Sequence, residues 1–300
     1  ITGLVTSWKM DEASGATTVA DSKGTNTGTI SGATPGVAGR SGNAISFDGV
    51  DDNVALPSGF SDFTNGFSVE AWANFTSNNG WETIVDLGNG NDINLIRFGR
   101  YYSNADIGLY TAESNWLWAS GSIINNEWHH YAATIDASGN RKIYKDGVQI
   151  ASGAGSVPAN ITRTKNYIGR SDYANNFFKG DVDEVAIYNR ALSAEEIYAH
   201  YVVKFQLAAS ADNSVWTDFV GPDGTVNSYF AVSGTDIPSS LDTKRYIKYK
   251  AYLSTADQSY TPALNDVSIT FSDNNAADRA ISDVSDNPFT ITVGGALSST

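Results

Sequence analysis

The sequence contains no cysteine. The chain therefore has neither disulfide bonds nor thiolate metal sites, which is compatible with a cytosolic protein and with a secreted bacterial one. Long apolar runs are also missing, because no stretch approaches the ~20 apolar residues that a membrane-spanning helix needs. We therefore expect no membrane insertion.

Basic side chains are few. The chain carries 19 Lys and Arg against 33 Asp and Glu, which gives a formal net charge of -14. A surface of this charge repels polyanions, so we expect no nucleic-acid partner.

The length of 300 residues, with a hydrophobic content of 41%, is typical of roughly two globular domains with ordinary cores. The first residues, ITGLVTSW, contain neither an initiator Met nor a signal-peptide core. We interpret the chain as a piece of a longer precursor whose targeting signal lies outside it.

Catalytic signatures are scarce as well. No G-x-S-x-G elbow, Gly-rich phosphate loop or His-rich metal motif occurs. The three histidines are His129, His130 and His200. We expect them to pack or to be hydrogen-bonded near a core.

Short segments rich in Val, Ile, Tyr, Phe and Trp, each ended by Gly, Asn, Asp or Ser, fill most of the chain. This pattern predicts an all-β sandwich or barrel. Residues 66–75 alternate with period two and carry a large aromatic on the second face, so both faces of this strand should be covered. Residues 128–152 predict a three-stranded meander with a type I′ hairpin at Asp146-Gly147.

Residues 180–201, GDVDEVAIYNRALSAEEIYAHY, contain a strand with three carboxylates and then a helix. Strict alternation places Asp181, Asp183 and Val185 on one face of the strand and Glu184 on the other. Ser193 and Glu196 form an S-x-x-E capping box, and Leu192 with Ile197 provides a hydrophobic staple.

Eight motifs occur in a characteristic order: SWKMDE (7–12), ADSKGTNTGT (20–29), AISFDGVDDNVALP (44–57), FSVEAWANF (67–75), EWHHYAATID (127–136), IYKDGVQIAS (143–152), YIGRS (167–171) and the segment 180–201. Together they resemble the laminin-G-like, concanavalin A-like jelly rolls of bacterial extracellular proteins, over residues 4–201. The resemblance implies a two-sheet antiparallel jelly-roll sandwich, commonly a carbohydrate-binding or adhesive module that often carries calcium.

We expect the laminin-G-like, concanavalin A-like domain at residues 1–202. Residues 203–273 predict about five more strands and hence a second, smaller β-sandwich that resembles accessory domains of bacterial surface proteins. Residues 274–300 are polar and are expected to be a linker or the start of a further module.

The resemblance suggests a structural calcium ion. The expected ligands are Asp21, Asp181 or Asp183, with the carbonyls of Lys23 and Asn26, because Ca²⁺ prefers several oxygen ligands. A second candidate is the turn DGVDD, with Asp48, Asp51 and Asp52. The alternative is that these are turn-forming Asp residues with solvated side chains.

Glycosidases that share this sandwich carry their acids in an E-x-D-x-E pattern on one strand. The nearest equivalent here is Asp181-x-Asp183-x-Val185, where an apolar residue replaces the second carboxylate that a retaining mechanism needs. We therefore expect no enzyme.

Aromatic and amide side chains alternate between residues 78 and 120. Such residues stack on the apolar faces of sugar rings and fix their orientation, although Trp116 and Trp118 also alternate as covering strand residues do. The segment contains Trp81, Asn91, Arg97, Arg100, Tyr101, Tyr102, Tyr110, Trp116 and Trp118. We expect Trp81, Asn91, Arg100, Tyr101, Tyr102, Trp116 and Trp118 to bind a ligand, joined by Tyr173 from the loop at 170–178.

The sequence thus predicts a non-catalytic carbohydrate-binding module of a larger secreted or cell-surface bacterial protein. Its partner would be an extracellular polysaccharide or glycan, and the module a monomer within a multidomain chain. Two other functions stay open: a structural spacer or protein-binding adhesin segment, and a glycan-cleaving enzyme.

Overall fold

The computed structural model describes residues 2–40, 42–77, 80–90, 94–102, 104–111, 115–172, 176–201, 204–230, 235–241, 244–252, 263–264, 268–271, 289–292 and 297–298. The chain folds into two compact units. The first contains Ile1–Tyr201 and Ala256–Thr261, and the second contains Val202–Thr255 and Pro262–Thr300. No helix in the described part of the chain is long and apolar enough to cross a membrane.

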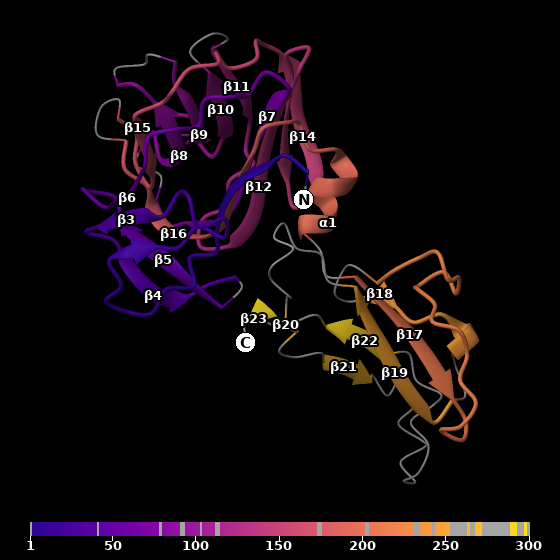
Figure 1. Cartoon of the computed structure of the whole chain (residues 1–300). Helices are drawn as coiled ribbons and strands as arrows, with labels where there is room; N and C mark the ends of the chain where they lie inside the picture. The colour runs from indigo at the N-terminus through magenta and orange to yellow at the C-terminus, as the bar shows by residue number, and fades with distance from the viewer. Residues whose placement is uncertain are drawn as a thin grey trace. The chain divides into compact units, whose positions relative to one another are not determined.

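The first unit is a sandwich of two antiparallel sheets, each of eight strands within the described residues (Figure 1). This confirms the predicted all-β, two-sheet jelly-roll class. Sheet A has the order β14-β13-β12-β7-β16-β5-β4, and β1 pairs with β16. Its strands are β1 (Leu4–Trp8), β4 (Thr34–Ala38), β5 (Asn43–Asp48), β7 (Gly66–Phe75), β12 (Trp128–Asp136), β13 (Asn140–Lys145), β14 (Val148–Ala154) and β16 (Lys179–Tyr188).

Sheet B packs against the inner face of sheet A and has the order β11-β10-β9-β8-β15-β6-β3-β2. Its strands are β2 (Thr18–Val19), β3 (Gly28–Ser31), β6 (Asn53–Leu56), β8 (Thr83–Gly88), β9 (Ile96–Arg100), β10 (Ile107–Thr111), β11 (Asn115–Ala119) and β15 (Lys165–Ile168).

The main core lies between the two sheets, and β7 shows how the sequence builds it. Its alternate residues Phe67, Val69 and Phe75 are fully buried in this core. Glu70 and Trp72, on the opposite face of β7, are also buried. Both faces of β7 are therefore covered, as its sequence pattern predicts.

Two local predictions are confirmed. Asp146 and Gly147 join β13 to β14 with positive φ angles of 52° and 76°, as a type I′ hairpin requires. At the start of α1 (Ala194–Tyr201), the amide of Ser193 donates to Glu196 Oε2 at 2.9 Å, and the amide of Glu196 donates to Ser193 Oγ at 3.2 Å. These reciprocal hydrogen bonds form the predicted capping box.

The predicted alternation along β16 is wrong beyond Asp183. The pairing of β16 with β7 is irregular between Asp183 and Ala186, and Glu184 has a left-handed φ of 48°. This bulge adds one residue, so Val185 lies in the main core rather than on the face of Asp183. The side chains of β16 that follow Glu184 therefore point to the faces opposite to those that strict alternation predicts.

The second unit has a small core around β17 (Lys204–Ser210) and β19 (Tyr246–Tyr252), which pair antiparallel. Phe205, Leu207 and Phe230 are among its buried residues. The other elements of this unit are β18 (Thr235–Asp236), η1 (Ser239–Leu241), β20 (Ala263–Leu264), β21 (Ser268–Phe271), β22 (Phe289–Thr292) and β23 (Leu297–Ser298). Because β22 pairs with β18 and β21, Phe289–Thr292 belongs to a sheet, and the interpretation of residues 274–300 as a linker or the start of a further module stays a prediction.

Candidate functional site

A row of directly paired residues crosses the outer face of sheet B. Trp116 of β11 pairs with Tyr110 of β10, Tyr110 pairs with Arg97 of β9, and Arg97 pairs with Asp86 of β8. Asp86 in turn pairs with Tyr167 of β15. The chain neighbours of Arg97, which are Ile96 and Phe98, lie in the core, so the row points away from it.

The row ends where β9, β10 and β11 lie side by side (Figure 1). Five rings are in contact at this end. Ring centroids are 5.1 Å apart for Trp81 and Tyr101, and 5.2 Å apart for Trp81 and Trp116. Tyr101 and Trp118 are stacked at 4.7 Å with an interplanar angle of 10°, and Tyr102 lies 5.7 Å from Trp81. We call Trp81, Tyr101, Tyr102, Trp116 and Trp118 the aromatic platform.

The aromatic platform is partly open to solvent. Tyr102 is 56% exposed and Trp118 is 44% exposed, whereas the other three rings are half-buried. Tyr102 has a left-handed φ of 58°, a conformation that is uncommon for a bulky side chain and that recurs at functional sites. The structure therefore brings together five of the eight residues predicted to bind a ligand.

Arg97 lies against the platform, although only 6% of its surface is exposed. Its guanidinium carbon is 4.9 Å from the ring centroid of Trp116, 5.2 Å from that of Trp81 and 5.9 Å from that of Tyr110. Cation–π contacts of this kind are attractive, and more so where the cation is desolvated. Arg97 thus fixes the positions of two platform rings from the buried side.

Asp86 is fully buried beside Arg97 in the row. Burial raises the pKa of Asp86 to about 7, although the hydrogen bond from Ser171 and the charge of Arg97 oppose this rise. The hydroxyl of Ser171 donates to Asp86 Oδ2 at 2.5 Å, and Arg97 Nη1 donates to Ser171 Oγ at 3.5 Å. We call this chain of hydrogen bonds, from Asp86 through Ser171 to Arg97, the polar relay.

Arg100 is a correction to the predicted ligand-binding set. Its side chain points into the sandwich, where Arg100 Nε pairs with Glu82 Oε2 at 2.5 Å and the guanidinium lies 4.9 Å from the ring of Phe75. With a side-chain exposure of 0%, Arg100 lies below the surface. Asn91 and Tyr173 lie outside the described residues.

Arg97, Asp86 and Ser171 were not among the predicted ligand-binding residues. The signal for Arg97 was present, since strict alternation in Ile-Arg-Phe-Gly-Arg places Arg97 outside whenever Phe98 faces the core. No comparable local signal links Asp86 to Ser171, because their contact spans 85 positions of the chain.

The residues predicted to hold calcium around Asp21 do not fit that ion. Asp21 Oδ1 accepts hydrogen bonds from the Thr6 hydroxyl and the amides of Ser7 and Lys23. Its Oδ2 accepts from the amide and hydroxyl of Thr25 and from the amide of Asn26. Although burial opposes it, these donors lower the pKa of Asp21, the Thr6 hydroxyl foremost.

The other members of that set are also engaged or distant. The carbonyl of Asn26 accepts a hydrogen bond from Trp8 Nε1 at 2.8 Å. Asp183 is fully buried and pairs with Trp72, whose ring contacts Tyr201 of α1 outside sheet A. Asp181 shares that outer face and accepts from Asn74 Nδ2 at 3.4 Å. Asp21, bonded to the inward-facing Thr6, lies on the inner side of the sheet, so the expected calcium set is not assembled.

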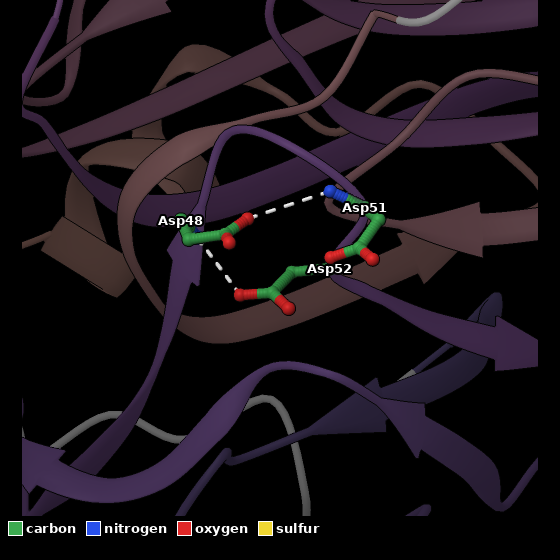
Figure 2. Close-up of side chains that lie close together, drawn as sticks. All are labelled: Asp48, Asp51 and Asp52. Carbon is green, nitrogen blue, oxygen red and sulfur yellow. Dashed lines mark hydrogen bonds between the residues drawn. The ribbon is translucent and has the colours of Figure 1, made fainter.

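The second calcium candidate is the turn between β5 and β6. Asp48, Asp51 and Asp52 each offer a carboxylate oxygen, and these oxygens lie within 4.8 Å of one another (Figure 2). The amide of Asp48 donates to Asp52 Oδ2 at 2.8 Å. Burial, and then the charges of Asp48 and Asp51, raise the pKa of Asp52. Three convergent carboxylates of this kind fit a hard cation such as Ca²⁺.

The histidines have the structural roles that we expected. His130 is buried, and His129 Nδ1 lies 2.7 Å from Asp146 Oδ2. His200 Nδ1 on α1 lies 3.0 Å from Glu70 Oε1 on β7. All three therefore pack or pair close to the sheet.

Comparisons with known proteins place this architecture in a family. A profile of the Laminin_G_3 family, described as concanavalin A-like lectin/glucanases superfamily, matches residues 48–198, just over half of the chain. A search of curated protein sequences gave no match.

Among solved structures, the chain is similar to domain 4 of AbnA, a GH43 extracellular arabinanase from Geobacillus stearothermophilus in complex with arabinotriose. The identity is 23% and the TM-score 0.48, over 65% of this chain and 97% of that one. It is also similar to Trypanosoma rangeli sialidase, with 20% identity and a TM-score of 0.51 over 66% of this chain. The match covers 32% of the sialidase chain, so only one part of that enzyme corresponds to this fold.

A third similar structure is the CBM40 of a Ruminococcus gnavus sialidase bound to α2,3-sialyllactose, at 14% identity and a TM-score of 0.40 over 49% of this chain and 94% of that one. Likeness at these identities concerns the fold. The profile match over half of the chain, on a two-sheet antiparallel sandwich, shows that this protein belongs to the concanavalin A-like lectin/glucanase superfamily.

Proposed function

We propose that the first unit is a non-catalytic carbohydrate-binding module and that the aromatic platform is its binding surface. The superfamily includes lectins and glucanases, so the fold leaves binding and cleavage both open and the site has to decide between them. The observation that carries the proposal is the open ring surface, with Tyr102 56% and Trp118 44% exposed.

Sugar rings present apolar C–H faces, which stack on aromatic planes, while a few polar groups fix their orientation. The stacked pair of Tyr101 and Trp118 offers such a plane, and Trp81 and Trp116 lie beside it at interplanar angles to Tyr101 of 86° and 57°. A contiguous exposed apolar patch of this kind is typical of an interaction site. Because Arg97 holds two of the rings, the platform is pre-organised and loses little conformational entropy on binding.

The burial of Asp86, the carboxylate of the row, favours binding without cleavage at this face. A retaining glycosidase needs two carboxyl groups about 5 Å apart on either side of the scissile bond. Asp86 has no exposed surface and is hydrogen-bonded to Ser171. On β16, the position equivalent to the second catalytic acid is Val185, which lies in the core.

The first test is an array of glycans and polysaccharides probed with the purified chain, in parallel in calcium and in EDTA. We expect binding to at least one polysaccharide, lost in Trp118→Ala and kept in Tyr249→Ala. Tyr249 is a suitable control because it is an exposed aromatic, 47% accessible, in the other unit. A blank array with folded protein would contradict the proposal and favour a spacer or protein-binding adhesin segment.

The enzyme alternative is tested on the same polysaccharides. Release of reducing ends or of unsaturated sugars by the purified chain would show that the module is catalytic.

We further propose that the module acts outside the cell, at the surface or in secreted form, and that it is a monomeric part of a multidomain chain. Light scattering of the purified protein checks the last point, and a stable dimer would contradict it.

A further inference from the structure

The aromatic platform rests on a buried ion network that its binding role alone does not explain. Asp86, Ser171 and Arg97 are all at least nine-tenths buried, yet the row that contains Asp86 and Arg97 ends at the half-buried Trp116. Buried charges are costly unless they are paired and hydrogen-bonded.

Hydrogen bonds connect the three residues in series. The hydroxyl of Ser171 donates a hydrogen bond to Asp86 and accepts one from Arg97, so Ser171 connects the carboxylate to the guanidinium. Arg97 contacts the rings of Trp81, Tyr110 and Trp116 on its other side. The position of the Arg97 guanidinium thus depends on Asp86. In turn it determines the positions of two platform rings, Trp81 and Trp116.

We propose that Asp86 is a positioning residue of the binding surface: when ionised, it holds Arg97 under Trp81 and Trp116, so that its protonation loosens the platform and weakens glycan binding. This inference rests on the proposed function. It adds a regulation by pH that the platform itself does not imply.

The surroundings of Asp86 determine its response to pH. Arg97 on β9 faces it with positive charge, and Asp172, just after β15, adds negative charge that opposes ionisation. Tyr167 pairs with Asp86 on β15 and is stacked under Arg170, whose guanidinium carbon lies 4.6 Å from the Tyr167 ring centroid. Because burial raises the pKa of Asp86 to about 7, its charge changes within the physiological range.

Thermodynamic linkage sets the direction and the size of the effect. If the ionised form binds glycan more tightly, then glycan binding must lower the pKa of Asp86 by the same coupling. A coupling of about half to one pKa unit corresponds to roughly a threefold to tenfold weaker binding below the titration than above it.

The decisive experiment follows the indole N–H signals of the free protein by ¹H–¹⁵N NMR between pH 5 and 9. Trp81→Phe and Trp116→Phe assign the two relevant signals. We expect both to shift with a midpoint near neutral pH in the wild type and to be insensitive to pH in Asp86→Asn. Asp52→Asn is the matched control, since it removes another buried Asp of raised pKa, in the turn between β5 and β6, and should leave both titrations unchanged.

Ser171→Ala keeps the carboxyl and removes the relay hydroxyl, and it should reduce the amplitude of both shifts. It also provides a second route should Asp86→Asn not fold. Signals of Trp81 and Trp116 that stay constant from pH 5 to 9 in the wild type, or that titrate equally in Asp86→Asn, would overturn the proposal.

The binding consequence is measured by affinity electrophoresis in gels that contain arabinan, laminarin or xylan, cast at pH 6 and at pH 8.5. We expect stronger retardation of the wild type at pH 8.5, and equal, weak retardation of Asp86→Asn at both values. Retardation that does not depend on pH in the wild type would contradict the coupling. If no gel retards the protein, the proposed function fails on these polysaccharides, while the indole titration still decides the role of Asp86.

Discussion

The outer faces of the two sheets carry similar residues and differ in what covers them. On sheet A, Trp72 stacks with Tyr201 of α1 at 5.6 Å, and Glu70 pairs with His200 under the same helix. On sheet B, Tyr101 stacks with Trp118 at 4.7 Å, and Trp118 stays 44% exposed. Aromatic content alone therefore does not distinguish a packed layer from a binding surface, whereas the presence of a covering helix does.

The buried carboxylates of the two faces, Glu70 and Asp86, have pKa values shifted in opposite directions. Burial alone would raise the pKa of Glu70, but the charges and hydrogen bonds of His200 and His130 outweigh it and hold that pKa far below the usual range. The hydroxyl of Tyr188 also donates to Glu70, at 2.9 Å. Asp86 is equally buried, but its partners do not outweigh its burial. Glu70 is therefore ionised in the folded state, whereas Asp86 titrates near neutrality.

The comparison predicts opposite results for two Trp→Ala substitutions. Trp72→Ala should lower the free energy of unfolding by about 3–5 kcal/mol, because it leaves a cavity between sheet A and α1. Trp118→Ala should change it by less than about 0.5 kcal/mol, since this ring is a surface residue, and should abolish glycan binding instead. Urea denaturation of both variants checks this, and a Trp118→Ala variant as unstable as Trp72→Ala would mean that the platform is a packed layer.

A smaller effect is expected from pH, in two overlapping windows. Burial alone would lower the pKa of His200, but Glu70 outweighs it, so this pKa is raised above 6.5. The stabilisation by the His200–Glu70 pair is thus fully present below pH 6.5 and is lost as the pH rises through the raised pKa. Asp86 retains its proton in the folded state between its ordinary pKa of 3.8 and about 7, so stability also falls with rising pH across that lower window.

Urea denaturation of the wild type between pH 4 and 9 should therefore show a loss of stability across both windows, to which Glu184 also contributes because burial raises its pKa to about 8. His200→Gln should reduce the loss above pH 6.5, and Asp86→Asn should reduce the loss between pH 3.8 and about 7. Asp218→Asn is the control for both, because Asp218 is exposed and lies in the second unit. A single loss that either substitution removes completely would mean that the two faces do not titrate independently.

The sequence predicts much of the fold because its local patterns are strong. The capping box of Ser193 and Glu196 and the hairpin at Asp146-Gly147 involve neighbours in the chain, and both are confirmed. The bulge at Glu184 was not predictable, because one extra residue in a run of alternating carboxylates leaves no local signal.

The binding face was predictable only in part. The spacing of aromatics identifies the five platform rings, but the choice of Arg100 over Arg97 shows the limit of composition. Which arginine faces outward depends on the phase of β9 relative to the core. The relay between Asp86 and Ser171 depends on β8 and β15 being neighbours, and this neighbourhood is a property of the topology.

The smallest predicted effect concerns the turn at residues 48–52, which joins β5 of sheet A to β6 of sheet B. We propose that Asp48, Asp51 and Asp52 bind Ca²⁺, because the ion would relieve the mutual repulsion that contributes to the raised pKa of Asp52. At ten times its dissociation constant, calcium would add about 1.4 kcal/mol of stability, or a few degrees in Tm.

Asp51→Asn should remove this calcium-dependent gain in Tm, because Asp51 is exposed and its loss leaves the buried part of the turn intact. Asp21→Asn offers the contrast: it should lower Tm equally in calcium and in EDTA, since protein donors already occupy both oxygens of Asp21. Differential scanning fluorimetry of the three proteins in both buffers measures this. Equal Tm values for the wild type in calcium and in EDTA would show that the three carboxylates shape the turn without an ion. If Asp21→Asn abolished the calcium-dependent gain in Tm, the calcium site would include Asp21 and not the turn at 48–52.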